Sequence, residues 1–155
     1  MISPELLRRF PFFAPFSENQ LKEIALISAQ DSAEKGTVLF EQDQPANTLF
    51  LLVDGGVDLY YTAGGESLPR TTKEFSVGEI NPGEIFGISA LVEPCILSAA
   101  ARLSQTASFV RIDAAELRKL LDADPSMGYA AMQQVTKVLY ERLEYTRVQL
   151  AACWA

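Results

Sequence analysis

Few of the side chains that carry out chemistry in proteins are present in this sequence. The chain has no histidine, which removes the usual proton shuttle, the Ser-His-Asp type of triad and the commonest metal ligand. Its two cysteines, Cys95 and Cys153, are far apart and form no Cys-x-x-Cys pattern, so they indicate free thiols rather than a disulfide scaffold or a zinc site. We therefore expect no catalytic residues, no bound metal and no cofactor, and we predict a protein that is not an enzyme.

The charge of the chain argues against nucleic-acid partners. Acidic residues number 20 and basic residues 13, giving a formal net charge of −7. Because the basic residues are scattered, a DNA or RNA backbone would be repelled, and we expect no direct nucleic-acid binding. The start of the chain lacks a charged leader with an apolar core, and no apolar stretch approaches the roughly 20 residues that span a bilayer. We expect a soluble, cytoplasmic protein without membrane contact.

The length and patterning predict one domain over residues 1–155 with helices at both ends. Ser17 to Gln20 has the form of a capping box, which predicts a helix of about 12 residues within an N-terminal helical region, 1–30. Short runs rich in β-branched and aromatic residues then predict an antiparallel β region over 35–112.

Two glycine pairs divide the middle of the β region. Gly55-Gly56, preceded by Asp54, and Gly64-Gly65 supply the positive φ angles that tight hairpins need. The strands expected around these pairs, which would form a meander, are 48–54, 56–63 and 71–77.

The C-terminal region, 113–155, is predicted to be helical. Asp113 to Glu116 forms a second capping-box pattern, and Asp124-Pro125 begins a long helix. Apolar residues at spacings of three and four lie on or beside one face of that helix: Met132, Val135, Leu139, Leu143 and Leu150. This face packs either on the β region of the same chain or on the matching helix of a second copy. We favour a homodimer, because at about 1.5 Å per residue the helix would reach beyond a small β-roll.

The order of these elements is similar to that of a known family. The chain resembles the cyclic nucleotide-binding domain, especially the sensor half of bacterial regulators of the catabolite activator protein type. The resemblance implies a mainly β fold with flanking α-helices, in which a double-stranded β-helix (a jelly-roll β-roll) lies between N-terminal helices and a long C-terminal helix. The stretches that carry the resemblance are Lys35–Phe40, Ala46–Leu52, Gly56-Val57, Val77-Gly78, Pro82–Gly87 and Ala90-Leu91.

The resemblance also places a phosphate-binding cassette at 82–99, and there the chain departs from the family. The family has a glutamate for the ribose 2′-hydroxyl where this chain has Ile88, and an arginine for the cyclic phosphate where it has Leu97. Losing both interactions, each worth about 1.5 to 3 kcal/mol, lowers affinity roughly several hundred-fold or more. The pocket residues implied by family position are Phe86, Gly87, Ile88, Ser89, Ala90, Leu91, Leu97, Ser98 and Ala99.

Other residues near this degenerate cassette have more local interpretations. We expect Arg102 to point outward from its strand, and the hydroxyls of Ser89 and Ser98 either to bind a ligand or to satisfy nearby backbone groups. Backbone amides after Gly87 are a weaker anion site, and Asp43 is expected to adopt a left-handed turn conformation. Aliphatic side chains are expected to fill the space of the pocket: Ile88, Leu91, Val92 and Leu97.

Two functions follow from these observations. The first is a regulatory or sensor domain that signals through its C-terminal helix, with weak or lost binding of cyclic AMP and cyclic GMP. Such a domain either responds to another, less polar small molecule or has no ligand. The alternative is an interaction or dimerisation scaffold without a small-molecule ligand. The sequence itself does not distinguish a whole protein from one part of a longer regulator.

Overall fold

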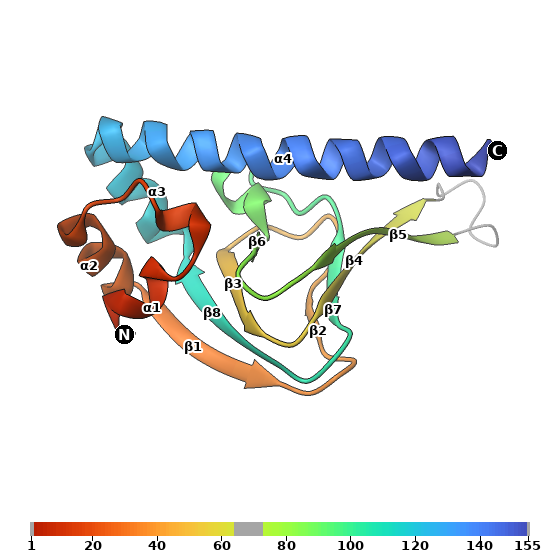
Figure 1. Ribbon diagram of the computed structural model, residues 1–155, viewed down its shortest axis with the longest axis horizontal. Helices are drawn as coiled ribbons and strands as arrows, with labels where there is room; N and C mark the ends of the chain where they lie inside the picture. The colour runs from red at the N-terminus through yellow and green to blue at the C-terminus, as the bar shows by residue number, and fades with distance from the viewer. Residues whose placement is uncertain (1, 64–72, 155) are drawn as a thin grey trace.

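Two four-stranded antiparallel sheets form a β-roll between helices (Figure 1). The computed structural model describes residues 2–63 and 73–154. One sheet has the strand order β1-β8-β3-β6, and the other has the order β2-β7-β4-β5. The strands are β1 (Ser28–Ala33), β2 (Val38–Phe40), β3 (Thr48–Asp54), β4 (Val57–Ala63), β5 (Lys73–Ile80), β6 (Ile85–Phe86), β7 (Ala100–Leu103) and β8 (Ala107–Asp113). The predicted mainly β roll with flanking helices is confirmed.

Helices lie at both ends of the chain. Figure 1 shows the N-terminal helices beside the first sheet and the last helix running across the roll. The helices are α1 (Pro4–Arg8), the 3₁₀ turn η1 (Pro11–Phe13), α2 (Glu18–Leu26), the 3₁₀ turn η3 (Ile88–Leu91), α3 (Ala114–Ala123) and α4 (Pro125–Cys153). The Gly64-Gly65 turn expected from the sequence lies outside the described residues.

The strand β3 is buried on both faces over residues 49–52. In β3, Leu49 and Leu51 pack against the helices, whereas Phe50 and Leu52 point into the core between the two sheets. Alternate residues of a strand point to opposite faces, so a strand covered on both sides needs a continuous apolar run. This explains why β3 shows no alternation of apolar and polar residues.

The capping box at the start of α2 is confirmed. The backbone N–H of Ser17 donates to Oε1 of Gln20 at 2.8 Å, and the N–H of Gln20 donates to Oγ of Ser17 at 3.2 Å. The helix has nine residues rather than about 12, because Ile27 leaves the helical conformation and β1 begins at Ser28.

The roll therefore begins earlier than predicted, and β1 lies partly in the region expected to be helical. This strand pairs with β8 along its whole length, from Ser28 opposite Ile112 to Ala33 opposite Ala107. Most of its side chains are exposed, since it is an edge strand held mainly by backbone hydrogen bonds. A short, polar edge strand has no hydrophobic periodicity by which sequence reasoning would find it.

The predicted meander of three strands is wrong in one connection. β4 and β5 pair as expected, but β3 and β4 belong to different sheets. The two glycines between β3 and β4 do not form a hairpin but allow the chain to pass close to residues 104–106. A Cβ atom at Gly55 would lie 2.5 Å from the carbonyl oxygen of Thr106, and one at Gly56 would lie 2.5 Å from Oγ of Ser104. Real Cβ atoms do not approach other atoms so closely, so the chain can change sheets here only with glycine.

The second capping box forms only in part. Oδ1 of Asp113 accepts a hydrogen bond from the N–H of Glu116 at 2.9 Å. The Glu116 carboxylate accepts from Nζ of Lys119 instead of turning back, because the N–H of Asp113 already donates to the carbonyl of Ile27.

The long C-terminal helix is confirmed. Oδ1 of Asp124 accepts from the N–H of Met127 at 3.3 Å, and Pro125 is the first helical residue. With 29 residues, α4 is about 43 Å long at about 1.5 Å per residue. Within the described part of the chain, no helix is both long and apolar enough to cross a bilayer.

Candidate functional site

Glycine is required at the turn between β6 and η3, and the neighbouring loop at Asp43 is hydrogen-bonded to Leu97. Gly87 has a φ of +73°, and a Cβ atom there would lie 3.1 Å from the carbonyl oxygen of Thr48. The N–H of Asp43 donates to the carbonyl of Leu97, and the N–H of Leu97 donates to the carbonyl of Gln44, both at 2.8 Å. Asp43 has a φ of +69°, which confirms its predicted left-handed conformation.

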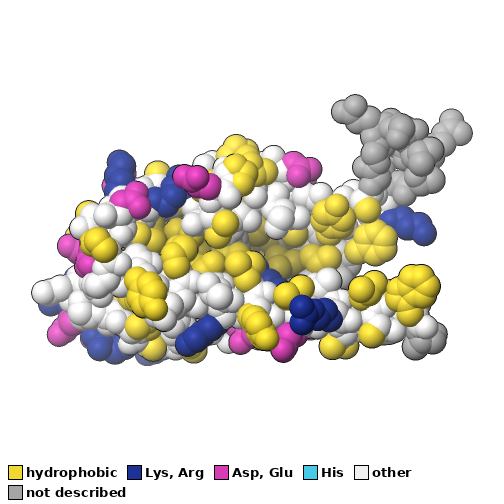
Figure 2. All heavy atoms as spheres, turned by 90° about the horizontal axis from the view of Figure 1, so that it is seen from above, with side chains coloured by type: hydrophobic (Ala, Val, Ile, Leu, Met, Phe, Trp, Pro, Cys, Tyr) yellow, Lys and Arg dark blue, Asp and Glu magenta, His cyan; other side chains and the backbone are white. Residues whose placement is uncertain are grey.

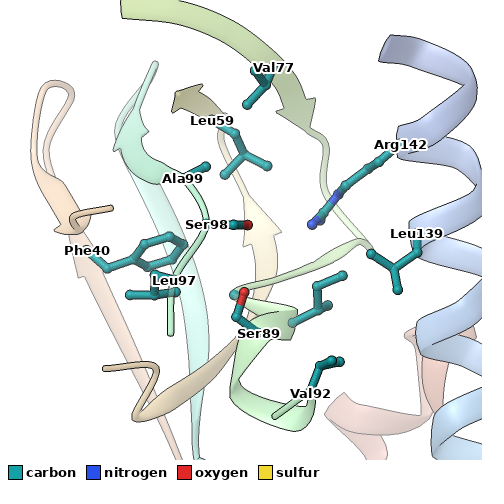
Figure 3. Close-up of a pocket in the computed structure, with 12 residues that line it drawn as sticks. Phe40, Leu59, Val77, Ser89, Val92, Leu97, Ser98, Ala99, Leu139 and Arg142 are labelled. Atoms are coloured by element: carbon teal, nitrogen blue, oxygen red, sulfur yellow. The ribbon is translucent and has the colours of Figure 1, made fainter. Parts of the chain in front are cut away.

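A cavity of about 300 Å³ lies between the roll and α4 (Figure 3). Its wall is mostly apolar, with two serines and one arginine as the polar side chains. The residues that line it are Phe40, Leu59, Val77, Gly87, Ile88, Ser89, Val92, Leu97, Ser98, Ala99, Leu139 and Arg142. A cavity of this size and composition is typical of a site for a small organic molecule.

Six of the nine residues named from family position line this cavity, and three do not. Phe86 is fully buried in the core between the sheets, where its ring stacks on Phe50 with centroids 5.0 Å apart. Ala90 is fully buried in a small cluster with Leu97. Leu91 packs on the helical side of the molecule. Successive residues of a 3₁₀ turn point in different directions, so only part of η3 faces the cavity.

The expectation that aliphatic side chains fill this space is not met. Ile88 and Leu97 are 6% and 5% exposed, and they pack against the inner clusters of the protein. Both side chains end at the wall of the cavity, and Leu91 is directed elsewhere. A cavity therefore persists, because no long side chain from the cassette extends across it.

The anion site considered at the backbone amides after Gly87 has little support. The residues from Ile88 to Leu91 form a four-residue 3₁₀ turn rather than an α-helix. So short a turn has almost no helix dipole with which to hold an anion.

Arg102 points away from the cavity, as predicted from the sequence. Its Nη2 lies 2.6 Å from Oε1 of Glu74, and its guanidinium lies 4.2 Å from the centroid of the Tyr60 ring. The hydrogen bond that Arg102 donates to the Glu74 carboxylate raises the pKa of Arg102 above its ordinary value. This arginine therefore belongs to the outer surface of the sheet and not to the pocket.

Sequence reasoning missed five residues of the cavity wall. Phe40, Leu59 and Val77 come from strands of the roll, whereas Leu139 and Arg142 come from α4. The spacing of three between Leu139 and Arg142 places them side by side on the helix, which was a usable signal. Where α4 crosses the roll depends on tertiary packing, however, and no local pattern records it.

Arg142 contributes a positive charge to the cavity wall. Figure 3 shows its side chain extending from α4 into the cavity, toward the wall that carries Ser89 and Ser98. Its Nη2 donates to the backbone carbonyl of Ile85 at 3.1 Å. Burial lowers the pKa of this guanidinium, while the carboxylates of Glu84 and Glu141 act in the opposite direction. An arginine remains charged under these conditions.

The apolar face predicted for α4 divides into two stripes. Val135 is 2% exposed and packs in the core of its own chain together with Met127 and Ala131, so Val135 is not available to a partner. The other four residues of the predicted face are between 37% and 59% exposed: Met132, Leu139, Leu143 and Leu150. At about 100° per residue these four point within roughly 40° of one another. We call them the α4 stripe.

The side of the molecule that α4 occupies is seen in Figure 2. Hydrophobic side chains gather there along a hollow in the middle of the face.

Across the described residues, no group of three or more acidic or cysteine side chains is placed to hold a metal ion.

The two-sheet roll, the 3₁₀ turn after Gly87 and the long helix beside the cavity are together the fold of a sensor-type regulatory domain. The family model described as "Cyclic nucleotide-binding domain" matches residues 30–124. The chain belongs to the cyclic nucleotide-binding domain family, and the resemblance drawn from its sequence is confirmed.

Solved structures agree with this assignment. A protein from Geobacter metallireducens GS-15, provisionally named as a cyclic nucleotide-binding protein, is 36% identical with a TM-score of 0.80, covering 92% of this chain and 99% of that one. The sensor domain of the transcriptional regulator DNR from Pseudomonas aeruginosa is 20% identical with a TM-score of 0.72, covering 90% of each chain. The catabolite activator protein of Thermus thermophilus is 19% identical with a TM-score of 0.69, covering 92% of this chain and 62% of that one.

One curated relative is much longer than this chain. A protein of Rhodopseudomonas palustris, provisionally named as a potassium channel protein, is 22% identical over 128 residues. The match covers 83% of this chain but only 29% of that relative.

Proposed function

We propose that this chain is a non-catalytic sensor domain that binds a small molecule between its roll and α4, and that it binds cyclic AMP and cyclic GMP weakly or not at all. One observation carries this proposal: a single cavity is lined both by the cassette, through Ile88 and Leu97, and by α4, through Leu139 and Arg142. A ligand in this cavity would touch the helix directly.

The weak binding of cyclic nucleotides follows from the cassette wall. The ribose hydroxyl and the cyclic phosphate would face Ile88 and Leu97, which are aliphatic and almost fully buried. Polar groups held against such a wall lose their hydrogen bonds with water and gain none in return, at about 1 to 3 kcal/mol for each group.

Signalling through α4 needs a ligand that prefers one position of the helix. Arg142 connects α4 to β6 through its hydrogen bond with the Ile85 carbonyl. A ligand that binds Arg142 or displaces it from this carbonyl would have different affinities for the two positions of α4, which is the thermodynamic requirement for coupling.

The experiment is a thermal-shift titration with cyclic AMP and cyclic GMP at millimolar concentrations. Binding to the native state must raise the melting temperature. Because we infer that the natural chain binds these nucleotides weakly or not at all, we expect no rise that saturates within the millimolar range. We expect a rise for the double variant Ile88→Glu with Leu97→Arg, which introduces the two missing nucleotide contacts. A control with the same charges at exposed sites, Leu26→Glu with Val148→Arg, should show none.

Two outcomes would contradict the proposal. A rise for the natural chain that saturates well below millimolar nucleotide would show that the cyclic nucleotide is its ligand after all. A double variant that melts cooperatively but does not bind would show that Ile88 and Leu97 are not at the nucleotide positions. Because Ile88 is buried, the single variant Leu97→Arg is measured alongside, and a partial gain in affinity is expected from the phosphate contact alone.

The exposed α4 stripe supports a second candidate, a dimerisation scaffold without a small-molecule ligand. Four large apolar side chains on one face of an exposed helix favour association with an apolar partner surface. The oligomeric state tests this candidate and is considered below at the scale of the whole molecule.

A further inference from the structure

We propose that the ligand of this cavity is a small organic carboxylate with an apolar body, whose carboxylate pairs with Arg142. The inference deepens the proposed function and rests on it, since it assumes that the cavity is a ligand site. It differs from the expectation for the family in both the position of the cation, on α4 instead of in the cassette, and the chemistry of the ligand.

The described residues that line the cavity include one charged side chain, that of Arg142 on α4. None of the ion pairs found in the described part of the chain includes it. A guanidinium has five N–H donors, and Arg142 uses one described partner, the Ile85 carbonyl. The remaining donors have the planar arrangement that matches the two oxygens of a carboxylate.

A polar part of the cavity wall faces Arg142. The side chains of Ser89 and Ser98 lie across the cavity from α4 (Figure 3). Neither hydroxyl donates a hydrogen bond to another described protein group. Each hydroxyl can donate to an oxygen held by the guanidinium, so the polar groups of the cavity converge on one end of a ligand.

The rest of the cavity wall is apolar. Phe40, Leu59, Val77 and Leu97 from the roll and Leu139 from α4 give the cavity its apolar surface. An aliphatic chain or an aromatic ring gains free energy by leaving water for such a surface. A nucleotide has polar atoms along its whole length, whereas an apolar carboxylate has them only at one end, as the cavity does.

A purely structural role for Arg142 is the competing explanation. In that role the aliphatic stem would cover the roll and the guanidinium would only hold the Ile85 carbonyl near Glu84 and Glu141. That role predicts no selectivity between a charged ligand and a neutral ligand of the same shape, and this difference can be measured.

The probes are benzoate and octanoate, each compared with its neutral amide, in thermal-shift and calorimetric titrations of the purified chain. We expect saturable binding of at least one carboxylate and weaker binding of its amide. The variant Arg142→Gln should lower the affinity for the carboxylate by roughly ten- to a hundred-fold and leave that for the amide unchanged, and Arg142→Lys should retain part of the affinity. The matched control is Arg147→Gln, an exposed position on the same helix, and it should bind as the natural chain does.

Other results would overturn the inference. Equal binding of a carboxylate and its amide, or an unchanged affinity in Arg142→Gln, would show that Arg142 does not hold an anion. The absence of a saturable shift with either carboxylate would also overturn it. If the double variant Ile88→Glu with Leu97→Arg still binds a cyclic nucleotide in that case, the cavity remains a ligand site and only the ligand class is wrong. If it does not, the proposed function fails as well.

Discussion

At the scale of the residue, the most informative comparison is between Leu97 and Arg142. By family position Leu97 stands where an arginine holds the cyclic phosphate, and it lies buried at the cavity wall. Arg142 reaches the same cavity from α4. The cavity thus has a cation, but on the opposite wall and beside different groups, so the ligand that fits it has a different arrangement of charge.

Gly55 provides a test of the crossing between the two sheets. A Cβ atom there would meet the Thr106 carbonyl oxygen at 2.5 Å, and φ is +97°. We expect Gly55→Ala to lower the free energy of unfolding by about 3 kcal/mol or more, measured by urea denaturation, because a steric overlap is added to the cost of the left-handed conformation.

The control for this prediction is Gly36→Ala. Gly36 has a similar φ of +91°, but a Cβ atom there meets nothing within 4 Å. This variant should lose only the conformational term of about 1 to 2 kcal/mol. Equal losses at the two positions would mean that the close crossing at Gly55 is not a source of strain.

At the scale of the element, the first turn of α4 is tied to α2 by one carboxylate. Oδ2 of Asp124 accepts from Nε2 of Gln20 at 2.9 Å, and Oδ1 accepts from Oγ of Ser126 at 2.9 Å and from the N–H of Met127. This side chain caps the helix and also fixes its position against the N-terminal helices. The anchored end of α4 is therefore far from the cavity, and the region after Val135 has fewer buried contacts.

These hydrogen bonds make Asp124 a determinant of acid stability. The hydrogen bond from Gln20, followed by that from Ser126, holds the pKa of the carboxyl below its ordinary value of 3.8. A carboxyl with a lowered native pKa stabilises the fold above its ordinary pKa, and this stabilisation is lost as the pH falls from 3.8 through the native value. We expect Asp124→Asn to be less stable than the natural chain at neutral pH and to lose less stability in that acidic range.

Urea unfolding at neutral pH and at a pH below 3.8 measures this difference. The control is Asp122→Asn, an exposed position in α3, which should follow the acid dependence of the natural chain. If Asp124→Asn follows it too, the carboxylate does not contribute to acid stability in the way that we infer.

At the scale of the whole molecule, the exposed α4 stripe predicts that two copies of the chain associate through this helix. We expect size-exclusion chromatography with light scattering to give the mass of a dimer of the 17.0 kDa chain. Two stripes packed together remove eight large apolar side chains from water. The double variant Leu143→Glu with Leu150→Glu should be a monomer with an unchanged circular dichroism spectrum.

The control for the dimer is Val148→Glu. Val148 is 65% exposed but points about 160° away from the stripe at about 100° per residue, so this variant should remain a dimer. A natural chain that is monomeric at high concentration would exclude the stripe as a dimer interface and would also remove the support for the scaffold role.

Local features of this protein were determined by its sequence alone. The caps at Ser17 and Asp124, the left-handed turn at Asp43, the bounds of β3 and the start of α4 were predicted because each depends on residues a few positions apart. The family was recognised for a related reason: its turns and strands follow in order, with spacings that the sequence shows directly.

Only the tertiary structure decided how these pieces meet. It placed β1 on the edge of a sheet by backbone pairing, separated β3 from β4 into two sheets, buried Val135 in its own chain, and brought Arg142 to the wall opposite Leu97. Each of these outcomes depends on contacts between residues that are distant in the sequence, and their energies depend on packing rather than on local periodicity. The composition of the cavity, and with it the ligand class that we infer, is therefore a property of the fold.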